Sequence, residues 1–307
     1  MNDIYQKTLA KKVVFKGIGL HSGKNSTINV IPAKENEGIV FKRIDLKENN
    51  LIKANFNNVS SARLCTTLEN NSGVKVSTVE HLLAAFYIIG IDNALVEIDN
   101  EEVPIMDGSS KDFICKLKKI DLLEQSKKRK YLKISNKIEL IDGKRKISIE
   151  QNESSLEVNF QLNYQNKIIA DQKNTIDFQK DDLKDVFNSR TFCLFEDIEK
   201  IKKFGLAKGG SLDNAIVVDN EKVLNKDGLR NDKEFVNHKI LDLAGDFLLS
   251  GYRVIGKVDC YQGGHELTNL FLRKIFNQNA DYQIIELNDF KISKKFHSES
   301  QKIAVNA

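Results

Sequence analysis

Tryptophan is absent from this chain of 307 residues, and tyrosine occurs seven times. Proteins that bind single-stranded nucleic acids commonly stack the bases on aromatic side chains, and few such side chains are present here. The net charge of +4 is spread over many lysines and carboxylates, and no long basic block stands out. Composition therefore argues against nucleic acid as a partner.

Closely spaced cysteines are also missing. The four cysteines lie far apart and form no C-x-x-C pair, which argues against a cysteine zinc site and against a disulfide framework. The start of the chain lacks the apolar core of a signal peptide, and no apolar run approaches the length of a membrane-spanning helix. We expect a cytoplasmic, monomeric protein without an integral membrane segment.

What is present suggests two domains, for which the length is sufficient. The polar run 124–130 separates two blocks of strand-like and helix-like segments and is predicted to be a linker between domains 1–124 and 131–307. Each block contains a predicted helix that carries a histidine and stops at a glycine. These helices are expected over about 78–89 and 233–250, and strands near 12–15, 26–31, 93–98, 131–135, 146–149, 156–162 and 254–260.

The first of these helices begins with an adjacent acid and imidazole, Glu80 and His81. A catalytic metal site needs a neutral ligand on the metal and a nearby base that is not a ligand, and this pair could divide those roles. Ser77 and Glu80 also fit the S/T-x-x-E capping box that begins ordinary helices. From these residues alone, both interpretations stay open.

The second predicted helix has two distinct faces. At about 100° per residue, His238, Asp242 and Asp246 share one stripe. A His and an Asp four residues apart can reach the same metal ion, although a solvated polar face is the competing interpretation. The apolar stripe on another face consists of Val236, Ile240, Leu243 and Phe247.

The other histidines occur in different contexts. His265 follows two glycines, and a permissive loop there could carry its side chain to a site, although a single histidine in a loop is more often incidental. His21, in a glycine-rich turn, is predicted to be structural. His297 lies in a polar C-terminal segment and is predicted to be exposed without a role.

Several longer sequence words occur in order along residues 5 to 290. They are residues 17–23 (GIGLHSG), 77–85 (STVEHLLAA), 90–93 (GIDN), 104–109 (PIMDGS), 189–192 (SRTF), 209–211 (GGS), 225–230 (NKDGLR), 235–239 (FVNHK) and 264–265 (GH). Together they resemble the zinc-dependent UDP-3-O-acyl-N-acetylglucosamine deacetylases of lipid A biosynthesis. Because no single short word carries the resemblance, it is specific.

The resemblance implies an α+β fold of two similar domains, each layering helices against a β-sheet, with the site between them and a βαβ-like insert near 195–223. It implies one catalytic zinc ion held by His81, His238 and Asp242, a ligand set that can also hold Fe²⁺. The other implied roles are Glu80 as general base, His265 as the acid that protonates the leaving amine, Asp246 as the carboxylate that holds His265, and Thr191 as an oxyanion donor.

The resemblance also implies how an acylated UDP-amino-sugar is bound. Lys239 would contact the nucleotide phosphates, and Phe192 would lie against the sugar. The remaining residues assigned to substrate, several of them in an apolar passage for the acyl chain, are Leu64, Ile198, Ala207, Gly210, Ser211, Leu212, Ala215 and Val217. Glu266 and Thr268 depart from the family pattern beside His265, and we expect Glu266 to face water.

These observations predict a zinc amidohydrolase that releases acetate from UDP-3-O-(3-hydroxyacyl)-N-acetylglucosamine, the committed step of lipid A biosynthesis. Two alternatives remain at this point. One is a zinc deacetylase acting on another nucleotide sugar or N-acetyl metabolite, and the other is a metal-dependent binding module without turnover. The binding module does not require Glu80, Asp246 and His265, so their presence together argues against it.

Overall fold

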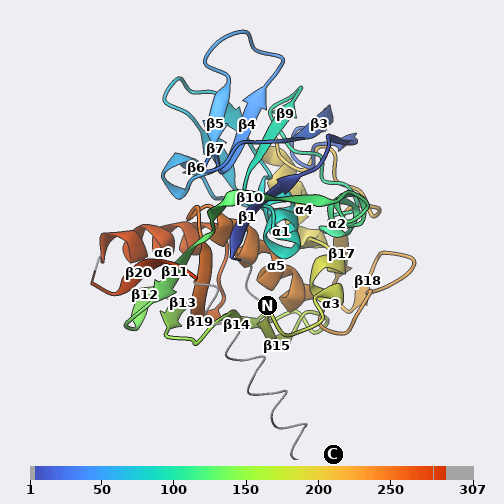
Figure 1. The fold of residues 1–307 in the computed structure, drawn as a ribbon. Helices are drawn as coiled ribbons and strands as arrows, with labels where there is room; N and C mark the ends of the chain where they lie inside the picture. Colours follow the sequence, from blue (N-terminus) through green and yellow to red (C-terminus); the bar gives the residue numbers. More distant parts are fainter. Residues whose placement is uncertain (1–3, 279, 288–307) are drawn as a thin grey trace, which may run out of the picture.

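The structure is a computed structural model that describes residues 4–278 and 280–287. Within these residues, helices and several sheets form two halves, and the N-terminal half lies above the C-terminal half in Figure 1. This arrangement confirms the predicted α+β class. None of the helices in the described ranges combines the length and the apolar character needed to cross a membrane. His297 lies outside the described residues.

The N-terminal half is built on a five-stranded sheet of order β2-β3-β9-β4-β5. Alternate side chains of β3 and β9 are buried, because a strand points successive residues to opposite faces of its sheet. Its strands are β2 (Val13–Ile18), β3 (Asn25–Pro32), β4 (Ile39–Arg43), β5 (Leu51–Lys53) and β9 (Ala94–Ile98). The half also contains α1 (Glu80–Ile89), α2 (Lys111–Leu117), the short 3₁₀ helix η1 (Phe56–Asn58), and a small sheet of β6 (Val59–Ser61), β7 (Thr67–Glu69) and β8 (Lys75–Val76).

The C-terminal half is built on a seven-stranded sheet of order β12-β13-β19-β11-β20, in which β14 also pairs with β19, and β15 pairs with β14. The central strand β19 is mostly buried, as expected for a strand with neighbours on both sides. The strands are β11 (Lys130–Ile134), β12 (Ile138–Asp142), β13 (Arg145–Glu150), β14 (Leu156–Asn163), β15 (Asp171–Asp177), β19 (Arg253–Tyr261) and β20 (Tyr282–Glu286). The helices are α3 (Lys184–Asn188), α5 (Glu234–Leu248) and α6 (His265–Asn277). The strands predicted in both halves are confirmed, with ends shifted by at most three residues.

A small βαβ unit projects from the C-terminal half, as predicted for the insert. Strand β16 (Phe192–Leu194) leads directly into α4 (Phe195–Lys203), and β17 (Ile216–Asp219) returns parallel to β16. The short β18 (Lys222–Val223) completes the sheet. The unit therefore begins three residues before the predicted start, because β16 is part of it.

Helices α1 and α5 lie against each other in the middle of the molecule (Figure 1). Every residue of α5 except Lys239 is buried, so the interpretation of its polar stripe as a solvated face is wrong. Gly245 is where the two helices touch: a Cβ there would lie 2.1 Å from the carbonyl oxygen of Glu80. Only glycine allows backbones to approach this closely.

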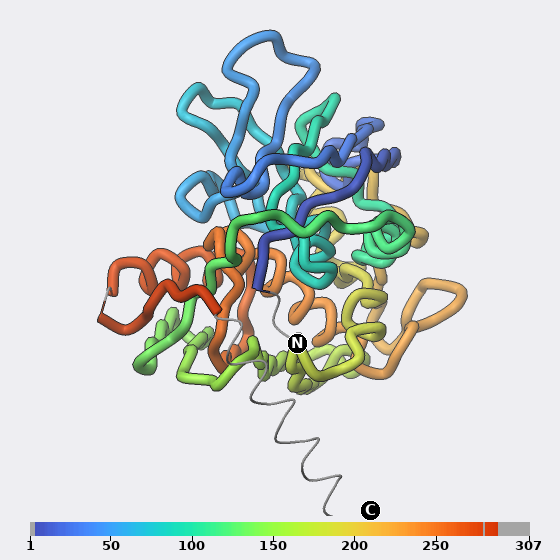
Figure 2. Tube along the Cα trace, in the orientation of Figure 1, coloured from blue at the N-terminus to red at the C-terminus, as the bar shows by residue number. Residues whose placement is uncertain are grey.

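The polar run 124–130 is not a loop. Most of it forms β10 (Leu122–Lys128), which pairs antiparallel with β1 (Tyr5–Leu9), and β11 begins at Lys130. Figure 2 shows the green chain of β10 running beside the blue β1 before the chain continues into the lower half. A two-stranded ribbon can leave most of its side chains in water, so a polar sequence suits it. The run predicted to link two domains is therefore mostly a strand.

Two buried arginines, Arg129 and Arg253, bind the C-terminal end of α1. Arg129 lies between β10 and β11, and its Nη2 donates to the carbonyl of Gly90 (2.8 Å) and to Asp92 (2.6 Å). Arg253, at the start of β19, donates to the carbonyls of Phe86, Tyr87 and Ile91. The carbonyl of Phe86 also accepts from the backbone of Gly90 and Ile91. The carbonyls at and beyond a helix end lack partners in the helix, and these guanidinium groups bond them from outside the N-terminal half.

Arg253→Met should lower the free energy of unfolding by roughly 3 kcal/mol, because it leaves three buried carbonyls without a charged donor. Arg145→Met is the matched control: its partner Glu266 is exposed and Asp142 is about half exposed, so less than about 1 kcal/mol should be lost. Chemical denaturation of both variants measures the difference. Equal losses would contradict the role given to Arg253.

Candidate metal centre and adjoining cavity

Helix α1 begins at Glu80 without a capping box. Val79 holds the capping position and makes no side-chain cap hydrogen bond. The Glu80 carboxylate instead accepts a hydrogen bond from the backbone N–H of Thr66 (3.0 Å). The interpretation of Ser77 and Glu80 as a capping box is therefore wrong. The Glu80 side chain is instead available to the polar side chains between the two halves, which are described next.

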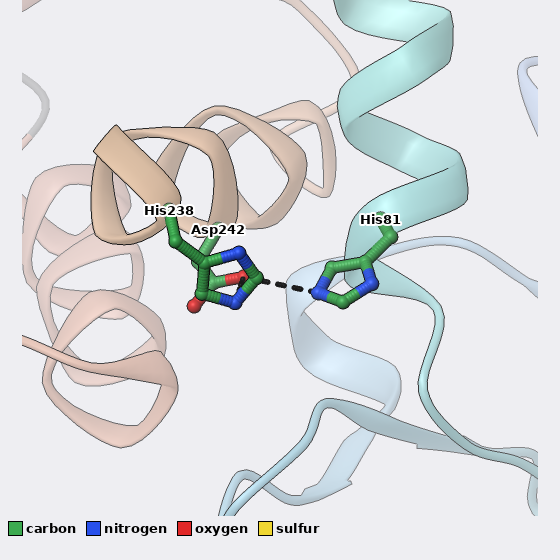
Figure 3. A group of neighbouring side chains, drawn as sticks. All are labelled: His81, His238 and Asp242. Carbon is green, nitrogen blue, oxygen red and sulfur yellow. Dashed lines mark ion pairs between the residues drawn. The ribbon is translucent and has the colours of Figure 1, made fainter. Parts of the chain in front are cut away.

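His81, His238 and Asp242 converge between α1 and α5 (Figure 3). One side-chain atom from each lies within 4.8 Å of the other two. The nearest oxygen of Asp242, Oδ1, is 3.5 Å from Nε2 of His81 and 3.4 Å from Nε2 of His238. All three side chains are almost fully buried.

These atoms fit a metal ion better than they fit one another. Asp242 Oδ1 is buried and has no hydrogen-bond partner among the described residues, although two imidazole nitrogens face it. Metal bonds of about 2.0–2.1 Å in a tetrahedral site place ligand atoms roughly 3.3 Å apart, close to the separations from Asp242 to each imidazole. Two nitrogens and one carboxylate oxygen are donors that zinc accepts, and three protein ligands leave a fourth position open.

The electrostatics also prepare these groups to be ligands. His238 donates from Nδ1 to the carbonyl of Ser189 (3.1 Å), which leaves the lone pair of Nε2 toward the site. Burial lowers the pKa of His238 to about 3, so its imidazole is neutral at pH 7. Burial opposes the charge on Asp242, but His238, Lys239 and His265 hold its pKa well below the usual range.

A second group of side chains lies beside the three. His265 is the first residue of α6, so its predicted place in a loop was wrong. Its Nδ1 donates to Asp246 (2.8 Å), and Nε2 lies 3.9 Å from Glu80 and 3.8 Å from Asp242. Thr66 completes the group, because its hydroxyl donates to the other oxygen of Asp246 (2.7 Å).

The two acid–base candidates have pKa values displaced upward for different reasons. Burial raises the pKa of Glu80, although the nearby imidazoles oppose that effect. Burial opposes the charge on His265, but the carboxylates of Asp246, Asp242 and Glu80 outweigh it and raise its pKa to about 10. His265 is therefore charged at neutral pH.

The structure also has an apolar cavity of about 350 Å³, lined in part by Phe192, whose ring centre is 6.3 Å from that of His238. It lies between the βαβ unit and the loop at residues 20–21 of the other half. Its lining includes Thr191 and all but one of the residues predicted to bind substrate, namely Leu64, Phe192, Ile198, Ala207, Gly210, Ser211, Leu212, Ala215 and Val217.

The remaining predicted contact, Lys239, lies at the edge of the cavity. Its Nζ is 2.9 Å from Asp242 and 5.6 Å from the centre of the Phe192 ring, which itself lines the cavity. Glu266 is mostly exposed and accepts a hydrogen bond from Arg145, which confirms that it faces away from the site. His21 is buried, and its Nδ1 accepts a hydrogen bond from the backbone of Ala207 (3.4 Å), in agreement with a structural role.

Sequence inspection missed two residues that hold the site together. Thr66 bonds both Glu80 and Asp246, and Ser110 donates to the carbonyl of His81 (2.7 Å). Ser110 directly follows the word PIMDGS, so its neighbourhood was marked in the sequence. Thr66 stands in no motif, and its partner Asp246 is 180 residues away, so no local pattern could have identified it.

Two imidazoles and a carboxylate buried between two α+β halves, next to Glu80 and His265, form a group that could hold a metal ion, as the site of a metalloenzyme does. The family model described as UDP-3-O-acyl N-acetylglycosamine deacetylase matches residues 6–277. UDP-3-O-acyl-N-acetylglucosamine deacetylases of Shewanella violacea and Idiomarina loihiensis are each 38% identical to the chain. These alignments cover 92% and 93% of this chain and 93% and 94% of the relatives. The chain belongs to this deacetylase family.

Removing the metal should abolish activity, and replacing a ligand should weaken metal binding. Protein treated with a chelator should regain activity with about one equivalent of zinc, and His81→Ala, His238→Ala and Asp242→Ala should each lower the metal content measured by atomic emission. Asp246→Ala is the control, because this carboxylate faces His265 and Thr66. Full metal content in all three ligand variants would contradict the ligand assignment.

Proposed function

We propose that the chain is a zinc-dependent hydrolase that removes acetate from the acetamide of UDP-3-O-(3-hydroxyacyl)-N-acetylglucosamine, the committed step of lipid A biosynthesis. The observation that carries this proposal is a buried His–His–Asp group beside Glu80 and His265, next to an apolar cavity. Phe192 links the two, because it lines the cavity and its ring centre is 6.3 Å from that of His238. Family membership supports the same substrate.

His81, His238 and Asp242 would hold the metal, with neutral His238 and ionised Asp242 already in the ligand form. When bound, zinc lowers the pKa of a coordinated water and polarises the carbonyl of the amide. The same nitrogen and oxygen donors can hold Fe²⁺, so the ion used in the cell is a separate question.

Glu80 acts as the general base in this proposal. It stands next to His81 in the chain but is tied to the backbone of Thr66 by one oxygen, so the other oxygen is free to take a proton. Its raised pKa brings the carboxylate closer to the working pH, where a general base is most efficient.

His265 supplies the proton that the leaving amine needs, because an amide nitrogen is a poor leaving group until it is protonated. Asp246 fixes the ring through Nδ1, which leaves Nε2 directed toward Glu80 and Asp242. Thr191 lines the cavity and would donate to the oxygen on which charge develops.

The cavity selects the substrate in this proposal. Its walls are mostly apolar, and Leu64, Phe195 and Leu212 remain about half exposed around it, which suits a hydrocarbon chain. Lys239 would pair with the nucleotide phosphates beside Phe192. We also propose that the enzyme is monomeric, with domains 1–124 and 131–307. We propose a cytoplasmic location, since nucleotide sugars are cytoplasmic metabolites.

Glu80→Gln tests the base directly. The amide retains the size of the side chain and can still accept from Thr66, but it cannot take a proton, so turnover should fall about 10²–10⁴-fold with the metal still bound. Glu266→Gln, on the exposed side of α6, is the matched control and should leave turnover nearly unchanged. A fully active Glu80→Gln enzyme would remove Glu80 from catalysis.

The pH dependence should identify the acid. His265 works as the charged form, so activity should fall as the pH rises through its pKa, and this fall forms the basic limb of the profile. Asp246→Ala removes a carboxylate that favours the charged imidazole, so the limb should move to lower pH. His265→Ala should reduce turnover strongly and flatten the limb. If both variants kept the parental limb, another group would be the acid.

Acyl-chain dependence separates this function from a general nucleotide-sugar deacetylase. Burial of each CH₂ contributes about 0.8 kcal/mol, so removing the whole chain should lower kcat/KM by several orders of magnitude. Ala215→Trp, which fills the cavity, should block turnover of substrates with long acyl chains and spare those with short ones. Ala215→Gly should leave turnover of long-chain substrates unblocked. Acetate release from acylated and unacylated UDP-N-acetylglucosamine measures this preference. If the unmodified protein had equal kcat/KM for the acylated and the unacylated substrate, a general nucleotide-sugar deacetylase would be favoured. If it bound metal but released no acetate, a metal-dependent binding module would be favoured.

A further inference from the structure

Glu102 is a buried carboxylate that forms no ion pair with lysine or arginine in the part of the chain that the structure describes. Three hydrogen bonds satisfy it instead. Oε1 accepts from the backbone of His21 (2.8 Å) and from the hydroxyl of Thr78 (2.9 Å), and Oε2 accepts from the backbone of Ser22 (2.7 Å). One side chain therefore joins two segments that are more than fifty residues apart.

The first segment is the wall of the apolar cavity. Leu20 and His21 line that cavity, and their carbonyls accept hydrogen bonds from Gly209 (3.0 Å) and Lys208 (3.3 Å) of the βαβ unit. The contact is close, because a Cβ on Gly209 would lie 2.3 Å from the carbonyl oxygen of Gly19. The loop held by Glu102 is thus packed directly against the insert.

Gly19 shows how tightly Glu102 itself is seated. A Cβ at this position would lie 2.4 Å from Oε2 of Glu102. The carboxylate therefore occupies the space beside the loop that any larger residue would fill. A displacement of the loop by an acyl chain would be transmitted to Glu102, since little free space separates them.

The second segment is the entrance to α1. Thr78 has a φ of 57°, a conformation that is rare for a β-branched residue, and its hydroxyl is the group that Glu102 holds. Thr78 is fully within the protein and stands two residues before Glu80. Ser77 pairs with the chain on either side of Glu102, through bonds with Glu101 (2.9 Å) and Val103 (3.1 Å).

Strained backbone persists where its surroundings enforce it, and it occurs preferentially at functional sites. Here the enforcing group is the same carboxylate that positions the cavity wall. We propose that Glu102 is a positioning residue that couples the acyl chain in the cavity to the placement of Glu80 and His81, so that an occupied cavity raises the rate of the chemical step. This proposal rests on the proposed function.

The coupling appears as a difference in kcat, because a chain that only binds would change KM alone. The measured quantity is the ratio of kcat/KM for acylated to that for unacylated UDP-N-acetylglucosamine. Thr78→Val removes the hydroxyl, preserves the β-branched shape, and leaves Glu102 bonded to the loop. In this variant kcat for the acylated substrate should fall, and the ratio should therefore fall about tenfold or more. Small misplacements of catalytic groups reduce rates by such factors.

Two variants serve as controls for Thr78→Val. Thr78→Ser retains the hydroxyl and should restore the parental ratio. Thr8, in β1, has another buried hydroxyl, which donates to the carbonyl of Asn93 (2.7 Å). Thr8→Val removes this hydroxyl and should not change the ratio. Metal content and thermal midpoint are measured for every variant, so that loss of zinc or of folded protein is detected. Glu102→Gln should lower the ratio as Thr78→Val does.

Several results would overturn the coupling. Equal losses of kcat/KM for both substrates would mean that Glu102 and Thr78 only stabilise α1. A change in KM alone would mean that they only stabilise the cavity wall. A parent enzyme that processes both substrates equally would reject the proposed substrate itself. A parent that prefers the acylated substrate, with an unchanged ratio in the Thr78→Val enzyme, would reject only the coupling.

Discussion

The close approach of α1 and α5 is the constraint on which the site depends. One helix comes from each half of the molecule, and the proposed ligands are divided between them, with His81 on α1 and the other two on α5. Gly245 lets the helices meet at the carbonyl of Glu80 itself, where a Cβ would have 2.1 Å of space. Any residue with a side chain would push α1 away and separate His81 from Asp242. At the far end of α1, Arg129 and Arg253 fix the same helix from outside its own half.

Burial gives neighbouring carboxylates different properties. Asp242 and Glu80 are both buried near His265, yet the pKa of Asp242 is lowered and that of Glu80 is raised. The difference follows from their partners: Lys239 donates to Asp242, whereas Glu80 receives one backbone N–H and no lysine or arginine among the described residues. One carboxylate is thereby suited to hold a cation and the other to take a proton. Asp246 holds His265 in place from the opposite side.

The local features were predictable because each depends on neighbouring residues. The spacing of His238 and Asp242 on one helix, the glycine that ends α1, and the alternation in β3 all follow from short-range geometry. The words shared with a known family supplied the grouping of His81 with α5, which periodicity alone could not. Burial of the polar face of α5 was not predictable, because it is created by α1 packing from a distant part of the sequence. The strand at 122–128 was missed for the same reason: its partner β1 lies at the other end of the N-terminal half.

The central claim is that two imidazoles from different halves of the molecule share one metal ion with a carboxylate. Zinc K-edge X-ray absorption of the full chain, loaded with one equivalent of zinc after chelation, tests it most directly. We expect only nitrogen and oxygen ligands, at about 2.0–2.2 Å, with the outer-shell scattering of two imidazole rings. A sulfur ligand at about 2.3 Å, or the signal of fewer than two imidazoles, would contradict it.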